Sequence, residues 1–382
     1  VILLAWDRTA KGEETVTTDW GTIWKYQEEC PLNNPLTFAS KLPGFLRWST
    51  WQILAFQNIE KDIILHYHDL DTLIGGVFTS KLGKLPLVYD CHENYPGLVK
   101  GAISSRGANI LHKIEAYLLN YCDGIMAAGP AGYIRLNDML NIGPSAPFNA
   151  NDDDAFKVLS KPQSEFLNSR VTRVGNAKRL DAYPLSRIEK RNQNKKFRIL
   201  YIGVLEKHPS RGILETAITV NKMKDVQFDI GGFGTLVPTI KKVCEKMENV
   251  NYIGSIHPDN VPLQTIESDA VLMALDPKND NNRMSAPNKL FEAMSAGVPI
   301  ITCKELLMGQ FVENEEIGLT FEWGKWDRLK AAIMKLVYDK ELQAKMGKRG
   351  RKLAEKTHNW EKCEERIESL YRYVKLNSIS HS

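Results

Sequence analysis

Short apolar runs alternate along the chain with stretches whose apolar residues recur at helical spacing. In the first half, the apolar runs predict strands at four places: 1–4, 63–66, 87–90 and 124–127. Helical spacing of apolar residues predicts helices at 72–82 and 108–121. This alternation of strands and helices is typical of parallel α/β sheets.

The same alternation starts again in the second half of the chain. Its apolar runs predict five strands: 197–202, 226–230, 250–253, 270–274 and 298–302. Three helices are expected between them: 212–223, 236–247 and 289–295. The polar run 188–196 indicates a linker, and 141–170, rich in turn-forming residues, indicates an irregular insertion. The pattern therefore predicts two α/β halves, followed by an amphipathic helix at 360–373.

Composition narrows the class of protein. The 382 residues are 43% hydrophobic and 25% charged, which is ordinary for a globular chain of two domains. No apolar run reaches the ~18 to 20 residues that a membrane-spanning helix needs. A net charge of +4, from 50 basic and 46 acidic residues, does not favour nucleic acid as a partner. The six cysteines are scattered without a C-x-x-C pair, which favours a reducing cytoplasm.

The start of the chain is unusual for a domain. Val1–Leu4 has the pattern of a buried strand, with neither an initiator Met nor a basic segment before it. We interpret this segment as part of a domain rather than as a secretion signal.

Polar residues follow two predicted strands of the first half. His66–Asp71 reads His-Tyr-His-Asp-Leu-Asp, and Asp90–Glu93 reads Asp-Cys-His-Glu. Ligands of open α/β sheets bind at the carboxyl ends of strands, so both segments mark a candidate site. A metallohydrolase using His66, His68 and Asp69 is an alternative. The H-x-H-x-D-H spacing of such enzymes is broken here, so we predict no metal site and expect these residues to cap the next helix.

Two segments of the second half suit an anion. The loop between the first strand of this half and its helix carries Lys207 and Arg211, and helix starts favour anions. At 284–301, Pro287 suits a helix start, and Lys289 in the first turn is unfavourable unless an anion lies nearby. Glu292, one turn after Asn288, could accept hydrogen bonds from a sugar diol. This combination favours a nucleotide site.

The segment 285–299 also resembles the donor-binding signature of glycosyltransferase family 4, whose members are retaining enzymes of the GT-B fold. The resemblance extends to four further segments: 65–71, 88–93, 174–176 and 358–361. It implies an α/β GT-B fold, in which two Rossmann-like, doubly wound domains face each other across a cleft. A C-terminal helix would cross back to the first domain.

The resemblance also implies domain boundaries. An acceptor-side domain would comprise 1–183 together with the crossing helix 360–382, and a donor-binding domain would comprise 188–359. Family members usually begin with a strand, a Gly-containing loop and a helix before a strand like Val1–Leu4. The expectation is therefore that this first β-α unit is missing here.

Roles follow residue by residue from the resemblance. Glu292 would bind the ribose of the donor nucleotide, and His92 would be the catalytic residue near the transferred sugar. Residues expected near the donor diphosphate are Lys207, Arg211, Asn288, Lys289 and Leu290. Residues expected on the acceptor side or next to the sugar are His68, Asp69 and Glu93. Neither a metal nor another cofactor is expected, because the cations would neutralise the departing diphosphate.

The implied reaction moves a sugar from a UDP- or GDP-sugar donor to a glycan or lipid-linked acceptor, with retention, in polysaccharide or glycoconjugate biosynthesis. The aromatic segment 41–56 would bring the protein to the inner face of the membrane, or it would be a core helix. One alternative is a catalytically weak sugar-nucleotide-binding protein. It is motivated by Met284, where the family's first glutamate would stand, and by Val204 in place of its usual arginine. A nicotinamide-dependent oxidoreductase is disfavoured, because no G-x-G-x-x-G follows the first strand.

Overall fold

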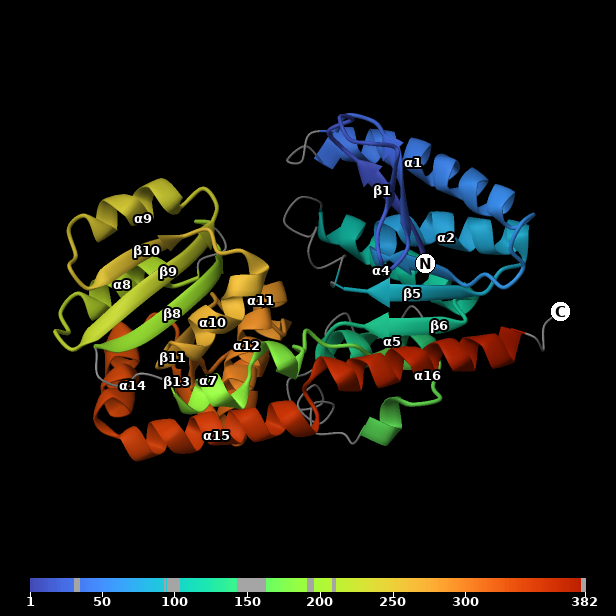
Figure 1. Ribbon diagram of the computed structural model, residues 1–382. Coiled ribbons are helices and arrows are strands. Elements are labelled where there is room, and N and C mark those ends of the chain that lie inside the picture. The colour runs from blue at the N-terminus through green and yellow to red at the C-terminus, as the bar shows by residue number, and fades with distance from the viewer. Residues whose placement is uncertain are drawn as a thin grey trace.

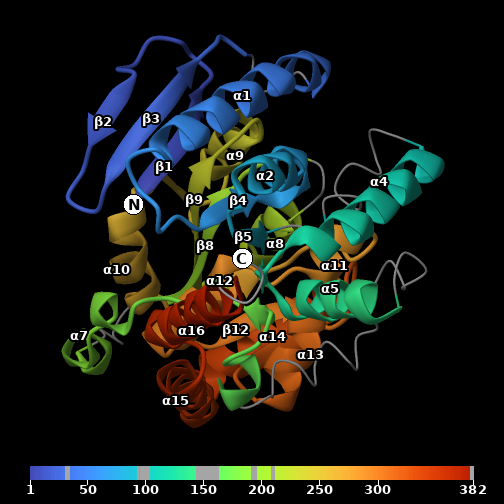
Figure 2. The same ribbon diagram turned by 90° about the vertical axis from the view of Figure 1, so that its right-hand side faces the viewer.

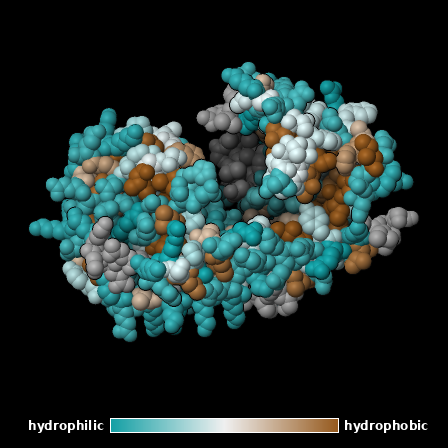
Figure 3. All heavy atoms as spheres, in the orientation of Figure 1, coloured by the Kyte–Doolittle hydropathy of each residue, from teal (hydrophilic) through white to brown (hydrophobic). Residues whose placement is uncertain are grey.

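The chain forms two α/β lobes that are joined along one side by the long helices α15 (Lys340–Lys356) and α16 (Trp360–Ser378) (Figure 1). The structure is a computed structural model that describes residues 1–30, 35–92, 94, 104–142, 163–190, 196–207 and 211–378. A hollow separates the lobes on the opposite side (Figure 3). Within these described ranges, no helix combines the length and the apolar character needed to cross a membrane.

The second lobe is built on a six-stranded sheet with the order β10-β9-β8-β11-β12-β13, in which every neighbouring pair is parallel. Its strands are β8 (Phe197–Val204), β9 (Val226–Phe233), β10 (Val250–Gly254), β11 (Ala270–Met273), β12 (Ile300–Cys303) and β13 (Gly318–Phe321). Its helices are α8 (Ile213–Val220), α9 (Val237–Cys244), α10 (Val261–Ile266), α11 (Asp280–Met284), α12 (Asn288–Ala296), α13 (Leu307–Asn314) and α14 (Trp326–Tyr338). Apolar clusters cover both faces of the sheet, as parallel sheets require.

The first lobe contains a four-stranded parallel sheet with the order β4-β5-β6-β7. Its strands are β4 (Leu65–His68), β5 (Leu87–Cys91), β6 (Gly124–Ala127) and β7 (Val171–Arg173), and its helices are α2 (Asp69–Gly83), α4 (Ser105–Leu118) and α5 (Pro130–Ile142). One face of this sheet is covered by α16, whose Leu370 and Val374 pack against Val88 of β5 and Met126 of β6. Helix α16 therefore completes the core of the first lobe although it follows the second lobe in the sequence.

A separate three-stranded sheet, ordered β1-β3-β2, lies beside the first lobe. Strand β1 (Ile2–Asp7) is parallel to β3 (Thr22–Gln27), and β2 (Thr15–Thr17) is antiparallel to β3. Helix α1 (Pro35–Phe56) runs alongside β1 and β3 (Figure 2). Trp6 stacks on Phe38 and Phe45 of this helix, with ring centroids 5.5 and 5.8 Å apart. The strands β2 and β3 were not predicted, because β2 has only three residues and Lys25 interrupts the apolar residues of β3.

The segment that joins the lobes, predicted as a linker at 188–196, is partly helical. A short helix, α7 (Leu185–Glu189), begins within the segment that joins the lobes. Gly231 and Gly232 belong to β9. A Cβ at Gly232 would lie 1.8 Å from the carbonyl oxygen of Gly203, so glycine permits the close pairing of β8 and β9 there. Most of the expected insertion 141–170 lies outside the described residues.

Candidate functional site

Residues from both lobes line a cleft of about 770 Å³. The first lobe contributes the ends of β5 and β6 and the segment after β7. The second lobe contributes the carboxyl ends of β8 and β9 and the segment before α12. Residues that line the cleft include His92, Arg135, Asn176, Lys178, Gly203, Val204, Arg211, Asn282, Met284, Asn288, Lys289 and Glu292.

The N-terminus of α12 opens onto this cleft. Pro287 is its N-cap residue and is extended (φ −66°, ψ 146°), and Gly297 ends the helix in the left-handed region (φ 60°). Six residues of the helix are buried in the second lobe, so their packing fixes its axis. The backbone N–H groups of its first turn, together with the helix dipole, favour a bound anion.

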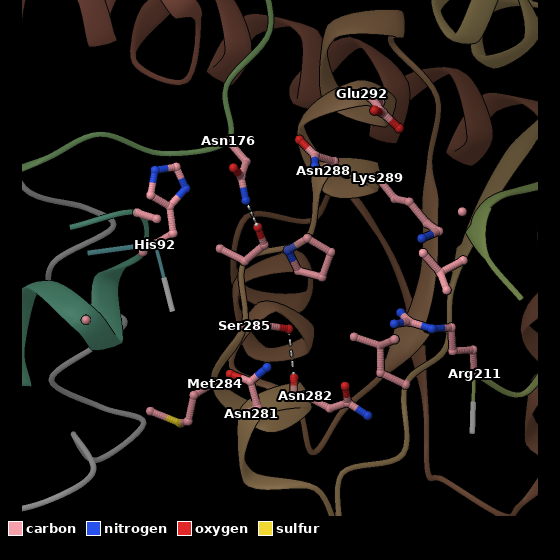
Figure 4. Close-up of a pocket in the computed structure, with 18 of the residues that line it drawn as sticks. His92, Asn176, Arg211, Asn281, Asn282, Met284, Ser285, Asn288, Lys289 and Glu292 are labelled. Carbon is pink, nitrogen blue, oxygen red and sulfur yellow. Dashed lines mark hydrogen bonds between the residues drawn. The ribbon is translucent and has the colours of Figure 1, made fainter. Parts of the chain in front are cut away.

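Two cations stand beside this helix start. Lys289 and Arg211 extend toward each other in the close-up view (Figure 4), and the Lys289 ammonium lies 4.5 Å from the centre of the Tyr201 ring. A Cβ at position 203 would approach Lys289 Nζ to 2.8 Å, so Gly203 leaves room for the ammonium. The Nε of Arg211 is buried and finds no hydrogen-bond partner among the described residues. A buried donor without a partner is costly, so this pair of cations suits an anionic ligand.

Burial, followed by the positive charge of Arg211, lowers the pKa of Lys289 to about 8, while Glu292 acts in the opposite direction. Lys289 is therefore charged below about pH 8 and loses its charge above it. We expect the affinity of the free protein for a nucleoside diphosphate to fall as the pH rises through this value. Arg211→Gln should weaken binding but move this fall to higher pH, because the repelling charge is gone. Calorimetric titration with UDP and GDP across this pH range would measure the affinity of both proteins. If the affinity of Arg211→Gln fell at the same pH as that of the wild type, the prediction would be contradicted.

Glu292 lies one turn further along α12, and a lysine from the other lobe holds it. Lys178 Nζ is 3.3 Å from Glu292 Oε1 and donates a 2.7 Å hydrogen bond to Asn288 Oδ1. Lys178 was missed by the sequence reasoning, because it follows the predicted turn 174–176 in an irregular segment without periodicity. Its position two residues after Asn176 was the only signal.

A second contact between the lobes orients the segment before α12. Asn176 Nδ2 donates to the carbonyl oxygen of Ala286 at 2.8 Å (Figure 4). Ser285 Oγ donates to the carbonyl oxygen of Asn282 at 3.0 Å. These bonds position the backbone that leads into the anion-binding end of α12.

The opposite wall of the cleft carries His92, directly after β5. Its side chain is 53% exposed, and its backbone N–H donates to Asp69 Oδ1 at 3.1 Å. Asp69 has a left-handed backbone (φ 58°), which is strained for a residue other than glycine. Asp69 therefore positions His92 rather than simply capping α2.

Not every residue expected in the site lines the cleft. Lys207 is exposed and outside the lining, and Glu93 lies outside the described residues. Leu290 is fully buried in the core, and its N–H donates to the carbonyl oxygen of Pro287. His68 lines a second cavity, beside β1 and β4. The structure does bring together His92, Arg211, Asn288, Lys289 and Glu292.

Comparisons with known sequences agree with this site. Residues 184–353 match the family model described as glycosyl transferases group 1. A curated relative from Mycobacterium tuberculosis, a GDP-mannose-dependent alpha-(1-6)-phosphatidylinositol monomannoside mannosyltransferase, is 23% identical over 147 residues. That alignment covers 37% of this chain and 38% of the relative, so the chain matches well under half of the relative's length.

Solved structures match nearly the whole chain. Sucrose-phosphate synthase from Thermosynechococcus elongatus superposes with a TM-score of 0.69 at 16% identity, covering 98% of this chain and 89% of that one. HepE from Anabaena, in complex with UDP-glucose, superposes with a TM-score of 0.58 at 15% identity, covering 91% and 84%. At these identities the likeness concerns the fold.

The two α/β lobes and the cleft between them have the GT-B fold, as these solved structures do. Residues 184–353, which hold the α12 site, are the part of the chain that is similar to the group 1 glycosyl transferases. The predicted fold is thus confirmed, and the match of residues 184–353 agrees with the predicted family and class of enzyme.

Proposed function

We propose that this protein transfers a sugar from a nucleoside-diphosphate sugar to a glycan or lipid-linked acceptor, with retention at the anomeric carbon. The observation that carries the proposal is the pair Arg211 and Lys289 at the N-terminus of α12, one helical turn from Glu292. The solved relative HepE binds UDP-glucose, and the curated relative is named for GDP-mannose, so both nucleotides are candidates.

In this proposal the donor diphosphate lies against Arg211, Lys289 and the first turn of α12. These groups stabilise the negative charge that develops as the sugar–phosphate bond breaks, and charge-assisted hydrogen bonds are the strong ones. Neither a metal ion on the phosphates nor another cofactor is needed, because the protein supplies the charge. Glu292 accepts hydrogen bonds from the ribose hydroxyls, and Lys178 holds its carboxylate in place.

The acceptor enters from the first lobe. His92 lies across the cleft from α12 and is held by Asp69, so it positions the transferred sugar or shares its charge. The acceptor hydroxyl gives its proton to the leaving phosphate rather than to a protein base. His68 and Asp69 lie on the side from which this acceptor would approach.

A catalytically weak nucleotide-sugar-binding protein is the second candidate. Met284 and Val204 both line the cleft, where the family's glutamate and arginine would otherwise add polar contacts. Transfer or hydrolysis of any donor by the wild-type protein would remove this candidate. Binding of a nucleotide sugar without turnover in the presence of acceptor extracts would favour it and overturn the enzyme proposal.

The membrane and cytoplasmic predictions stay predictions. Phe45 and Trp48 of α1 pack against Tyr26 of β3, which supports the core-helix interpretation of 41–56, while Trp51 is 68% exposed.

If the segment contacts an anionic bilayer, Trp51→Ala should reduce sedimentation of the protein with phosphatidylglycerol vesicles. All six cysteines lie within the described residues and are thiols.

Glu292→Ala tests the proposed function. Loss of hydrogen bonds to a carboxylate costs about 1.5–3 kcal/mol, so we expect donor affinity to fall about 10- to 150-fold. A thermal-shift screen of UDP- and GDP-sugars first identifies the donor, because a ligand stabilises the native state by mass action. Calorimetric titration then compares Glu292→Ala with Glu248→Gln, an exposed glutamate outside the cleft. Equal affinities in the two variants would contradict the ribose role.

A further inference from the structure

Three histidine rings converge on one carboxylate oxygen at the carboxyl ends of β4 and β5. Asp90 Oδ2 lies 3.4 Å from His66 Nε2, 3.2 Å from His68 Nδ1 and 2.9 Å from His92 Nε2. His68 Nδ1 is also 3.3 Å from His92 Nε2. The ligand atoms of His66, His68 and Asp90 all lie within 4.8 Å of one another. Three imidazole nitrogens thus gather around one carboxylate oxygen, and His66, His68 and Asp90 form a group close enough to hold a metal ion.

These separations agree with a tetrahedral coordination shell. With Zn–N and Zn–O distances of about 2.0–2.1 Å, neighbouring ligand atoms in a tetrahedron are about 3.3 Å apart. Four of the six separations between these ligand atoms, the three to Asp90 Oδ2 and the one between His68 and His92, run from 2.9 to 3.4 Å. Imidazole nitrogens and a carboxylate oxygen are also the donor set that zinc and its neighbours in the first transition series accept.

Hydrogen bonding alone satisfies this cluster poorly. If His92 Nε2 donates to Asp90, it cannot also accept a proton from His68 Nδ1. If both nitrogens donate to Asp90, their two N–H groups face each other at 3.3 Å. A dication between them is instead attractive to all four groups, because it takes a lone pair from each neutral imidazole and from the carboxylate.

The surroundings orient the rings as a metal site requires. His66 Nδ1 contacts the hydroxyl of Tyr371 on α16, so an Nδ1–H donated to that hydroxyl leaves the Nε2 lone pair directed at Asp90. A ligating histidine typically donates its other N–H in this way. Asp69 fixes the backbone of His92 from α2. Three ligands therefore come from rigid strand ends, and the fourth from the residue directly after a strand.

We propose that His66, His68, Asp90 and His92 bind a transition-metal dication, for which Zn²⁺ is the best-fitting ion. The bound ion ties the ends of β4 and β5 together, supports the contact of the first lobe with α16 through Tyr371, and fixes the ring of His92. The prediction from the sequence was that no metal binds. It paired His66 and His68 with the adjacent Asp69, whereas the fold supplies Asp90 from the neighbouring strand.

The experiment uses untagged full-length protein, purified without metal-affinity resin and stripped with EDTA. Titration with Zn²⁺ should saturate at one ion per chain, as measured by calorimetry and elemental analysis after gel filtration. Titration with Co²⁺ should give the visible absorption bands of tetrahedral cobalt, and Zn²⁺ should abolish them. This test does not depend on sugar transfer, so the failure of either proposal leaves the other standing.

The variants separate this site from adventitious binding. Because even a supporting group is worth about 10- to 100-fold in metal affinity, His66→Ala and His68→Gln should each lower Zn²⁺ affinity by more than about 100-fold, and Tyr371→Phe by about 10-fold. His257→Ala, which removes an exposed histidine 3.3 Å from Asp259, is the matched control and should bind Zn²⁺ as the wild type does. His68 is half exposed, so its variant should keep the wild-type circular dichroism. Zn²⁺ binding that does not saturate, or equal affinity in folded His68→Gln, would overturn the proposal.

Discussion

Replacing Lys289 with methionine should slow sugar transfer by about 10²- to 10³-fold, the usual effect of losing one group that stabilises charge in a transition state. Methionine keeps the apolar contact with the Tyr201 ring but removes the ammonium at the N-terminus of α12. Arg211 would then face the departing diphosphate without its partner. Because the missing charge matters most when the sugar–phosphate bond breaks, the loss should fall mainly on kcat rather than on KM.

Lys207→Met is the matched control for this prediction. Lys207 is a lysine of the same lobe, but it is exposed and outside the cleft. Steady-state kinetics with the donor found by the thermal-shift screen should give wild-type kcat for Lys207→Met. A similar loss in both lysine variants would show that net charge, rather than the position of Lys289, controls the rate.

Buried strands of this fold could be read directly from the sequence. The apolar run at 124–127 coincides with β6, and the run at 87–90 falls within β5, because parallel strands covered on both faces carry apolar residues at nearly every position. The strand β3 was missed because one of its edges joins the short strand β2, and its residues are only half-buried. Such strands depend on their neighbours more than on local composition.

The site was predictable where its residues neighbour the end of a strand or the start of a helix. Lys289 and Glu292 share one helix turn, and His92 directly follows β5. Local spacing was therefore enough to predict all three as candidate site residues. Lys178 and Asn176 act by reaching from the first lobe to α12, and no spacing in the sequence shows that contact. Lys207 and Leu290 do not line the cleft although they lie near it in the sequence, because sequence proximity does not fix the direction of a side chain.

A buried ion pair beneath the cleft wall that carries His92 also depends on contacts that only the fold creates. Arg135 of α5 forms a two-pronged contact with Glu115 of α4, in which Arg135 Nη2 lies 3.1 Å from Glu115 Oε1. Both side chains are almost completely buried, and Tyr89 donates a 3.0 Å hydrogen bond to the same oxygen. Burial opposes the charge of Arg135, but the carboxylate of Glu115 outweighs it and raises the pKa of Arg135. The Arg135 guanidinium therefore remains charged.

Glu115→Ala should lower the free energy of unfolding by about 3–5 kcal/mol, because it leaves the Arg135 guanidinium buried without its counter-charge. Urea denaturation followed by fluorescence would measure the loss. Glu322→Ala is the matched control: Glu322 pairs with Lys304 at 2.7 Å, but both side chains are half exposed, so the cost should be about 0–1 kcal/mol. The double variant Glu115→Leu, Arg135→Met should recover much of the loss, because it removes both charges from the core. Equal destabilisation by Glu115→Ala and Glu322→Ala would show that water reaches the α4–α5 pair. In that case Arg135, whose Nη2 lies 3.3 Å from Cys91 Sγ, could not support the strand end that carries His92.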